Sequence, residues 1–273
     1  MNQMPEAPAI VADAKALRSR AADGEIRFAD GDKGTVSWQL PEEVPVALQL
    51  NSEAYTVMMA TPADLRDFAI GFVLAEGLIA NASDITGVLV MPVENGITVD
   101  VAVAESAINP ARLVRRSVEG RSGCGLCGVE DIASAIRPLA PVSRAHTLSA
   151  AAILKAAKAL PDKQPMNRLN RTVHGAAWVS FDGEILLVRE DVGRHSALDK
   201  LIGALAQSKT DPASGFVLMT SRCSFELVQK SVTFGIGALV TVSAPTALAL
   251  DLAKNSNLFL AALGAGGAVV FNP

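Results

Sequence analysis

The residues best suited to chemistry are two cysteines in a glycine-rich stretch. Cys124 and Cys127 lie in the sequence RSGCGLCG at residues 121–128, and they are two of the three cysteines in the chain. A buried structural cysteine needs neither a second thiol at this spacing nor glycine neighbours, because it packs as a small apolar residue. Two thiols this close on a pliable loop indicate metal binding, dithiol redox exchange or sulfur transfer.

Metal binding is weakly supported by the rest of the chain. A structural zinc ion needs four donors, usually cysteine or histidine, and one C-x-x-C motif supplies two. The remaining candidates are single residues scattered through the sequence: Cys223, His146, His174 and His195. Because no second paired motif exists, we predict no metal site, and a zinc-stabilised binding module stays open only as an alternative.

Redox exchange and sulfur transfer both remain open from the residues alone. A dithiol oxidoreductase usually carries its C-x-x-C at a helix start within a thioredoxin-like unit, and no such frame surrounds these cysteines. In sulfur transfer, a thiolate carries sulfur as a persulfide. Nearby arginines and a helix predicted to start near Val129 favour the thiolate, and the glycines let the loop move between donor and acceptor.

Composition restricts the class of protein. Half of the 273 residues are apolar, so the chain can bury a large core without disulfide staples. The formal net charge of −4 argues against broad nucleic-acid binding by bulk charge. The N-terminal sequence lacks the pattern of a secretory signal, and no convincing membrane-spanning run is present. We therefore expect a cytoplasmic protein that binds neither nucleic acid nor membrane.

The first half is predicted to be an α+β domain. Residues 1–22 read as a flexible N-terminal segment, and residues 23–140 as a domain that carries the cysteine loop. In this domain a helix is expected to start at Thr61, which can cap it, and to end at Gly77. Strands are predicted at 36–39, 44–50, 55–60, 88–91 and 97–103. Two prolines and weak periodicity between 137 and 147 indicate the domain boundary.

The second half, residues 141–273, alternates strands with helices and predicts a mixed, mostly parallel sheet covered by helices. Ligands of such sheets bind at the carboxyl ends of strands. The residues that follow three of the predicted strands suit an anionic ligand: Arg194 and His195, Ser221 and Arg222, and the glycines at 264, 266 and 267.

Other polar residues of this half have plainer explanations. Capping of a helix explains Asp191 as well as a functional role does. Asp199 and Lys200 are explained as part of a solvated helix face. His174 reads as a hydrogen-bonded core residue, and Cys223 as a half-buried thiol without a role.

Several segments in this order resemble the FdhD family of formate dehydrogenase accessory sulfurtransferases, and the likeness extends over nearly all of the chain after the first twenty or so residues. The segments are TPADL at 61–65, GFVLAEGLI at 71–79, SGCGLCG at 122–128, REDVGRHSALDK at 189–200, SR at 221–222 with ELVQK at 226–230, and VSAPTALA at 242–249.

The resemblance implies a cytoplasmic homodimer whose second domain is a cytidine-deaminase-like α/β/α sandwich. It implies that Cys124 accepts sulfur from a cysteine desulfurase as a persulfide, with Cys127 as its companion. The sulfur then passes to the molybdenum cofactor, the bis-molybdopterin guanine dinucleotide, for the catalytic subunit of formate dehydrogenase. The family's cofactor-binding segment falls on Ala262, Leu263, Gly264, Ala265, Gly266 and Gly267. Deamination is not implied, since no second C-x-x-C with a histidine–glutamate partner exists.

The chain departs from the resemblance at two places. Many members have a glycine pair before the histidine, where this chain has Arg171-Thr172-Val173-His174. Many also carry an arginine in the C-terminal segment, which here reads LGAGGA at 263–268. Arg222, Arg194 and the glycine amides are the groups we expect to replace that charge. Within the predicted site, a chaperone that holds the cofactor without sulfur transfer remains a further alternative.

Overall fold

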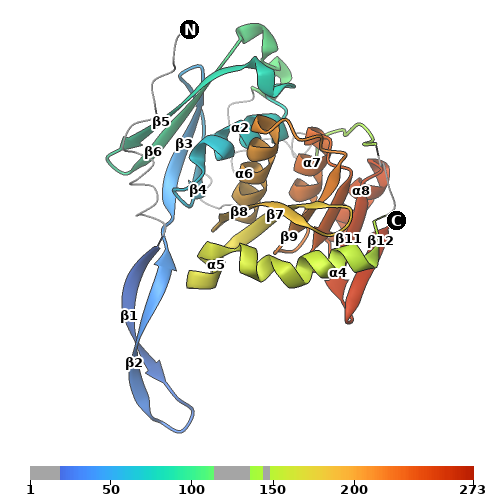
Figure 1. Cartoon of the computed structure of the whole chain (residues 1–273). Helices are drawn as coiled ribbons and strands as arrows, with labels where there is room; N and C mark the ends of the chain where they lie inside the picture. The colour runs from blue at the N-terminus through green and yellow to red at the C-terminus, as the bar shows by residue number, and fades with distance from the viewer. Residues whose placement is uncertain (1–18, 114–135, 144–147) are drawn as a thin grey trace.

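The computed structural model describes residues 19–113, 136–143 and 148–273, and these residues form a mixed α/β structure with three sheets (Figure 1). The strands, in chain order, are β1 (Ser19–Arg27), β2 (Lys33–Pro41), β3 (Val44–Leu50), β4 (Glu53–Ala60), β5 (Ile85–Val93), β6 (Gly96–Val103), β7 (His174–Ser180), β8 (Ile185–Asp191), β9 (Gly215–Met219), β10 (Ala238–Thr241), β11 (Phe259–Gly264) and β12 (Gly267–Asn272).

The described helices belong mainly to the second half of the chain. The α-helices are α2 (Leu65–Ala75), α4 (Ala150–Ala159), α5 (Pro165–Asn170), α6 (Arg194–Gln207), α7 (Phe225–Phe234) and α8 (Ala247–Asn255). Short 3-10 turns are η1 (Ala82–Asp84), η2 (Glu105–Ala107), η3 (Pro110–Arg112) and η4 (Leu160–Lys163). No helix among these is long and apolar enough to cross a bilayer.

The layers are stacked around one large core and one smaller core, and a third small cluster contains Ala63, Met166 and Val173. Helix α4 covers one face of the six-stranded sheet, and α6, α7 and α8 cover the other. Helix α2 lies between α6 and the four-stranded sheet, and its residues Phe68 and Phe72 are buried in the larger core. Apolar residues of both sheets therefore meet in one continuous interior, which fixes the two halves of the chain against each other.

Two glycines allow α2 and α6 to cross with their backbones in contact. A Cβ added at Gly71 would lie 1.7 Å from the carbonyl oxygen of Asp199, and one at Gly203 would lie 1.9 Å from that of Asp67. Neither position has room for a side chain. This close crossing brings polar groups of the first half within reach of α6.

The six-stranded sheet has the order β12-β11-β10-β9-β7-β8. The prediction of a mixed sheet is confirmed, but "mostly parallel" is wrong for its pairings. Only β9–β10 and β10–β11 pair in parallel, whereas the pairings of β7 with β8, of β7 with β9 and of β11 with β12 are antiparallel. The reason is that both strands of the hairpins β7–β8 and β11–β12 belong to this sheet. Strand β7 lies between β8 and β9, and β12 forms the edge opposite β8.

The strand directions still bring four strand ends to one edge. Because β8 and β9 both run opposite to β7, the strands β8, β9, β10 and β11 all point the same way. Their carboxyl ends and the start of β7 therefore share one side of the sheet, which we call the strand-end edge. The residues predicted to bind a ligand follow three of these four strands.

A two-stranded arm of β1 and β2 extends away from the body (Figure 1). Its first strand begins at Ser19, so the prediction of a flexible segment up to residue 22 is wrong for residues 19–22. The physical reason is cross-strand pairing: Ala22 lies opposite Trp38, and Ser19 opposite Pro41. Helix α5 supports the arm, because the backbone carbonyl of Asn170 accepts a hydrogen bond from the Trp38 indole at 3.4 Å.

Candidate functional site

The strand-end edge gathers the predicted ligand-binding residues from three loops. Arg194 and His195 open α6 after β8, Ser221 and Arg222 follow β9, and residues 262–267 span the turn from β11 to β12. Since neighbouring strands lie about 4.8 Å apart, the row from β8 to β11 is about 19 Å long. An elongated ligand is therefore needed to contact the whole row.

Two arginines give this edge a positive character. Arg222 is exposed between β9 and α7. Arg194 is half-buried, and its Nε atom is buried without a hydrogen-bond partner among the described residues. A buried guanidinium N–H without an acceptor is costly, and an anionic ligand would satisfy it. The pair suits phosphate or another anion.

His174 belongs to this edge, although the sequence favoured a core role for it. It is the first residue of β7, pairs in register with Asp191 at the end of β8, and lies beside β9. Burial lowers the pKa of His174, the charge of Arg194 lowers it further, and a hydrogen bond to the backbone of Thr220 only partly opposes this. The imidazole is thus neutral at pH 7 and half-buried among the candidate ligand-binding groups.

His195 lies beneath the surface of the edge rather than on it. It is 1% exposed, and its Nε2 atom is 3.4 Å from both the Ser224 hydroxyl and a carboxylate oxygen of Glu226. Burial alone raises the pKa of Glu226, but hydrogen bonds from His195 and Ser224 outweigh burial and lower it. His195 therefore ties the start of α6 to the start of α7, and so supports the loop that carries Arg222.

Asp191 and Lys200 form a fully buried ion pair. The Lys200 Nζ atom is 2.6 Å from Oδ2 of Asp191, and neither side chain is exposed. The same carboxylate accepts hydrogen bonds from the backbone N–H of Thr61 at 2.9 Å and of Gly193 at 2.8 Å. The interpretation of Lys200 as part of a solvated helix face is wrong, because its partners come from other segments.

Thr61 is also placed differently from its prediction. Helix α2 begins at Leu65, and its N-cap residue Asp64 makes no side-chain cap hydrogen bond. The Thr61 hydroxyl instead accepts from the N–H of Val192 at 3.1 Å, and its carbonyl accepts from Lys200 at 3.0 Å. Thr61 thus joins the first half of the chain to the loop before Arg194 and does not cap the helix.

Asp199, too, is buried, so its prediction as a solvated residue is wrong. It accepts two hydrogen bonds from Lys230 of α7, at 2.8 and 2.9 Å, and Lys230 is also 3.0 Å from Glu76 beyond the end of α2. Burial raises the pKa of Asp199 to about 6 although Lys230 lowers it. Burial alone lowers the pKa of Lys230, but Asp199 and Glu76 outweigh burial and raise it.

The cluster of buried charges formed by Asp199, Lys230 and Glu76 also binds residues that adjoin the segment with Cys124 and Cys127. Arg137 donates from Nη1 to the carbonyl of Glu76 at 2.7 Å, and its backbone N–H donates to the Gln229 side chain at 2.6 Å. Upstream of the segment, the Arg112 carbonyl accepts from the Tyr55 hydroxyl at 3.2 Å. Burial, and then the charge of Arg137, lowers the pKa of Arg112.

Cys124 and Cys127 lie outside the described residues, as does the helix predicted from Val129. The two flanks of their segment lie near the end of α2: Arg137 is bound to Glu76, and Arg112, whose carbonyl is held by Tyr55 of β4, lies beside Gly77. Within the described residues, no cluster of histidine, cysteine and carboxylate side chains is suited to holding a metal ion.

The two residues next to Arg222 in the sequence, Ser221 and Cys223, have side chains that are engaged or buried within the protein. The Ser221 hydroxyl donates to the carbonyl oxygen of Arg222 at 2.9 Å. Cys223 is completely buried, and burial raises the pKa of its thiol to about 12. The interpretation of Cys223 as half-buried is therefore wrong, because the thiol is enclosed on all sides, and a thiol that stays protonated and inaccessible is a poor nucleophile.

The C-terminal glycines form a tight turn at the strand-end edge. Ala265 and Gly266 both have positive φ angles, of 49° and 77°, as expected for a two-residue hairpin turn between β11 and β12. A Cβ added at Gly266 or Gly267 would contact nothing within 4 Å. The backbone here is open on its outer side, so a ligand can approach it closely.

The comparison with known proteins decides the family. The model of the FdhD/NarQ family matches residues 41–271. The chain belongs to the FdhD/NarQ family. This assignment covers the four-stranded sheet, α2, the cysteine segment and the six-stranded sheet.

Curated relatives and one solved structure agree with the family. Proteins named "Sulfur carrier protein FdhD" are 47% identical in Cupriavidus necator (85% of this chain, 81% of the relative) and 45% identical in Bordetella petrii (83% and 81%). The Agrobacterium fabrum protein of that name is 42% identical over 94% of both chains. A Desulfotalea psychrophila crystal structure, described as a candidate formate dehydrogenase accessory protein, shares the fold with a TM-score of 0.74 at 24% identity, covering 93% of this chain and 97% of that one.

The buried Asp199 predicts a characteristic pH dependence of stability. Its pKa of about 6 in the folded protein exceeds the ordinary 3.8, so the folded state retains a proton that the unfolded chain releases between these values. The stability contributed by this proton is complete below about pH 4 and is lost as the pH rises through 6. The advantage of the wild type over Asp199→Asn should therefore shrink by up to about 3 kcal/mol from pH 4 to 7.

Chemical denaturation at several pH values measures this difference. Asp251→Asn removes an exposed carboxylate of α8 and is the matched control. A difference between wild type and Asp199→Asn that stays constant or grows with pH would contradict the assignment.

Proposed function

We propose that this chain is a sulfur carrier that accepts sulfur on Cys124 and delivers it to the molybdenum cofactor for formate dehydrogenase. The observation that carries the proposal is the strand-end edge, where Arg194 and Arg222 offer an anionic ligand two guanidinium groups. A C-x-x-C motif and the names of the relatives support the sulfur chemistry. The cofactor is cargo and substrate here, not a resident group.

Sulfur acceptance is a thiolate exchange. The Cys124 thiolate attacks the outer sulfur of a persulfide on a cysteine desulfurase, a new S–S bond forms, and the desulfurase cysteine leaves as a thiolate. Delivery uses the second cysteine: the Cys127 thiolate attacks the inner sulfur of the Cys124 persulfide, and the outer sulfur leaves as hydrosulfide. The resulting Cys124–Cys127 disulfide retains the two oxidising equivalents, so atoms and electrons balance.

The residues of the edge fit the proposed cargo. Phosphate oxygens of a dinucleotide would satisfy the buried Nε of Arg194 and bind Arg222, and the open backbone at 264–267 would admit the other end of the ligand. These groups compensate for the arginine that the C-terminal segment lacks. The neutral His174 adds a hydrogen-bond acceptor beside them.

The contacts of Arg137 with Glu76 and Gln229 support delivery of sulfur from the cysteine segment to the strand-end edge. Its contact Gln229 lies five residues along α7 from Ser224 at the edge, which is about 8 Å at 1.5 Å per residue. Cys124 is thirteen residues before Arg137, a span that reaches up to about 43 Å when extended. The distance from the anchor to the edge is thus easily covered.

The remaining parts of the proposal concern assembly. We infer a cytoplasmic homodimer that meets the desulfurase and the formate dehydrogenase catalytic subunit in turn. We also keep the two-domain division at residue 140 and the cytidine-deaminase-like character of the second domain as proposals.

The sulfur-carrying residue can be identified by intact-protein mass spectrometry after incubation with a cysteine desulfurase and cysteine. The wild type should gain about 32 Da, the mass of one sulfur atom. Cys124→Ala should lose this adduct. Cys127→Ala should keep it and release sulfide more slowly, because the attacking thiolate is missing.

Cys223→Ala is the matched control, since this thiol is buried and protonated. An adduct that survives in Cys124→Ala, or no adduct in Cys127→Ala, where the second thiolate cannot release the sulfur, would refute the proposed role of Cys124.

Anion binding at the strand-end edge is tested separately with purified molybdenum cofactor. Arg222→Ala should weaken binding about tenfold, as expected for loss of one charge-assisted hydrogen bond. Arg168→Ala, which removes an exposed arginine of α5, should leave binding unchanged. Equal affinities of wild type and Arg222→Ala would exclude Arg222 from the site without affecting the assignment of Cys124.

A further inference from the structure

The arm of β1 and β2 has one apolar face, which we call the apolar arm face. The register pairs even-numbered residues of β1 with even-numbered residues of β2, so all of these lie on the same face of the ribbon. A Cβ added at Gly34, which is on this face, would lie 3.1 Å from Ile26 and 4.0 Å from the ring of Phe28, so Phe28 lies there as well. The large apolar side chains of the face are Ile26, Phe28, Val36, Trp38 and Leu40.

The opposite face of the arm is polar, and several of its charges pair with one another. The Glu25 carboxylate accepts from Arg27 Nε at 2.6 Å and is 3.6 Å from Lys33 Nζ. This face is therefore suited to water.

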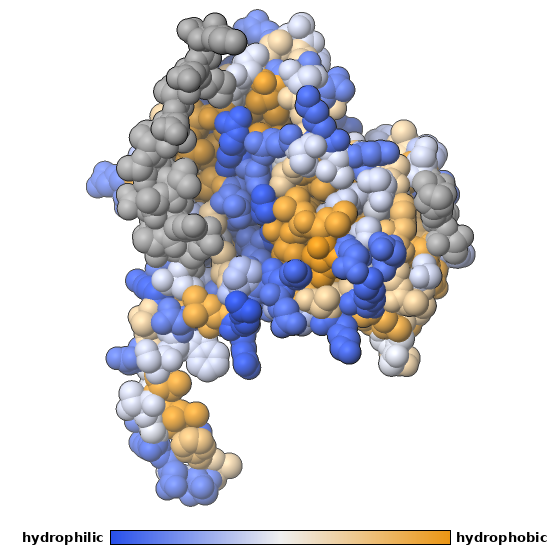
Figure 2. Space-filling view, viewed as in Figure 1, coloured by the Kyte–Doolittle hydropathy of each residue, from blue (hydrophilic) through white to orange (hydrophobic). Residues whose placement is uncertain are grey.

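The apolar arm face is exposed. Figure 2 shows an apolar strip on the arm, bordered by polar residues. A two-stranded ribbon is at best marginally stable in water, and an exposed apolar strip of this kind marks an interaction surface. Four of its large side chains are between 38% and 51% exposed: Ile26, Phe28, Trp38 and Leu40.

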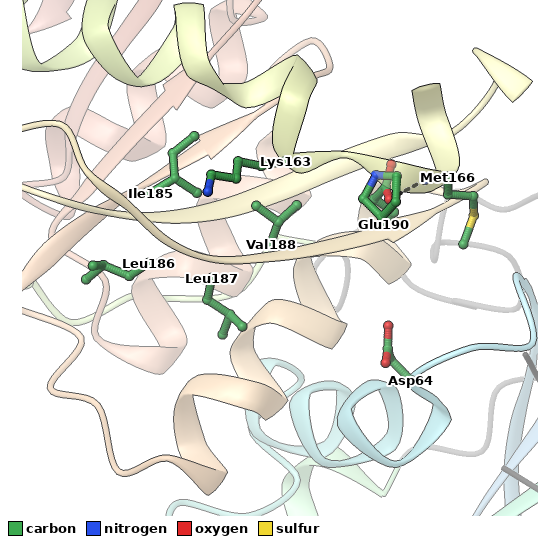
Figure 3. A pocket seen from close by; sticks show the side chains of 9 residues that line it. Asp64, Lys163, Met166, Ile185, Leu186, Leu187, Val188 and Glu190 are labelled. Carbon is green, nitrogen blue, oxygen red and sulfur yellow. Dashed lines mark hydrogen bonds between the residues drawn. The ribbon is translucent and has the colours of Figure 1, made fainter. Parts of the chain in front are cut away.

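The base of the arm is attached to α5. The Trp38 indole donates to the carbonyl of Asn170, and the Asn170 side-chain amide donates to the Ser19 hydroxyl, both at 3.4 Å. Helix α5 is itself held on the body of the protein, because the N–H of Met166 donates to the buried Glu190 carboxylate at 2.9 Å (Figure 3). The arm therefore leaves the body at a defined position beside the end of α5.

The two ends of the arm carry opposite charges. The turn at the tip, which we call the acidic turn, contains the exposed residues Asp30 and Asp32. Next to the base, Arg168 lies in the last turn of α5 and Arg171 follows the helix, and both are exposed. We call these two residues the α5 arginines.

This distribution makes the apolar arm face complementary to itself. Two copies related by a two-fold axis can stack this face either tip to tip or tip to base. Tip-to-tip stacking brings both acidic turns together, where like charges repel. Tip-to-base stacking instead brings each acidic turn to the α5 arginines of the other copy. Each strand has nine residues and is about 30 Å long, so two arms that overlap fully reach from tip to base.

We propose that two copies of this chain dimerise through their apolar arm faces, stacked tip to base, with each acidic turn bound to the α5 arginines of the other copy. This interface deepens the homodimer inferred under the proposed function and rests on that part of it alone, since sulfur transfer is not involved. Residues 19–40 of the arm precede the region matched by the FdhD/NarQ family model.

Sedimentation velocity of the full chain over a range of concentrations tests the apolar contribution. The wild type should dimerise, and Phe28→Asp should raise the dissociation constant at least about tenfold, because it buries a charge in an apolar interface. Since Phe28 is 51% exposed, this substitution should leave the circular dichroism spectrum unchanged. Leu89→Asp, at a 57% exposed position of the four-stranded sheet, is the matched control and should dimerise like the wild type.

Charge reversal tests the direction of stacking. Asp30→Arg with Asp32→Arg should weaken the dimer at least about fivefold, and so should Arg168→Glu with Arg171→Glu, since ion pairs at both ends of the interface become repulsive. The variant with all four substitutions should dimerise nearly as well as the wild type, because each reversed turn then meets reversed α5 residues. Tip-to-tip stacking predicts no such rescue.

Four results would overturn the proposal. A wild type that stays monomeric would refute the homodimer as well, while the mass-spectrometric test of Cys124 would be unaffected. An unchanged dimer in Phe28→Asp would refute the arm interface alone. Dissociation by Leu89→Asp would assign the dimer to the outer face of the four-stranded sheet. Failure of the fourfold variant to recover dimerisation would refute the tip-to-base arrangement.

Discussion

Lys200 and Asp191 meet at 2.6 Å in a place where neither side chain is exposed to water. Removing two charges from water costs several kcal/mol per ion, and only close pairing with further hydrogen bonds compensates for it. Both ions have such bonds: Asp191 accepts from Thr61 and Gly193, and Lys200 donates to the carbonyl of Thr61. The segment that leads to Arg194 thus depends on a residue from the other half of the chain.

A second set of buried charges extends this connection toward the cysteine segment. Asp199 lies one residue before Lys200 on α6 and binds Lys230 of α7, which reaches Glu76. Glu76 and Gln229 in turn hold Arg137. The strand-end edge and the flank of the cysteine segment are therefore attached to the same three helices, α2, α6 and α7, and the close crossing of α2 and α6 requires Gly71 and Gly203.

The sequence predicted much of this architecture. The alternation of strands and helices correctly indicated that Arg194 and Arg222 would each follow the carboxyl end of a strand. It missed His174 at the same edge, because nothing in the sequence says that β7 enters between β8 and β9. It also assigned Asp199 and Lys200 to the surface, where unpaired charges belong. Lys230, which pairs with Asp199, is 31 residues away from it, and Thr61, whose carbonyl binds Lys200, is 139 residues away, so only the tertiary structure identifies these partners.

The free energy of unfolding in a double-mutant cycle of Asp191→Asn and Lys200→Met tests this dependence most directly. Each single substitution leaves one buried charge without its partner and should cost about 3–5 kcal/mol. The double variant removes both charges, so its loss should be clearly smaller than the sum of the single losses. Strictly additive losses, or single losses below about 1 kcal/mol, would contradict the view that this ion pair holds the strand-end edge in place.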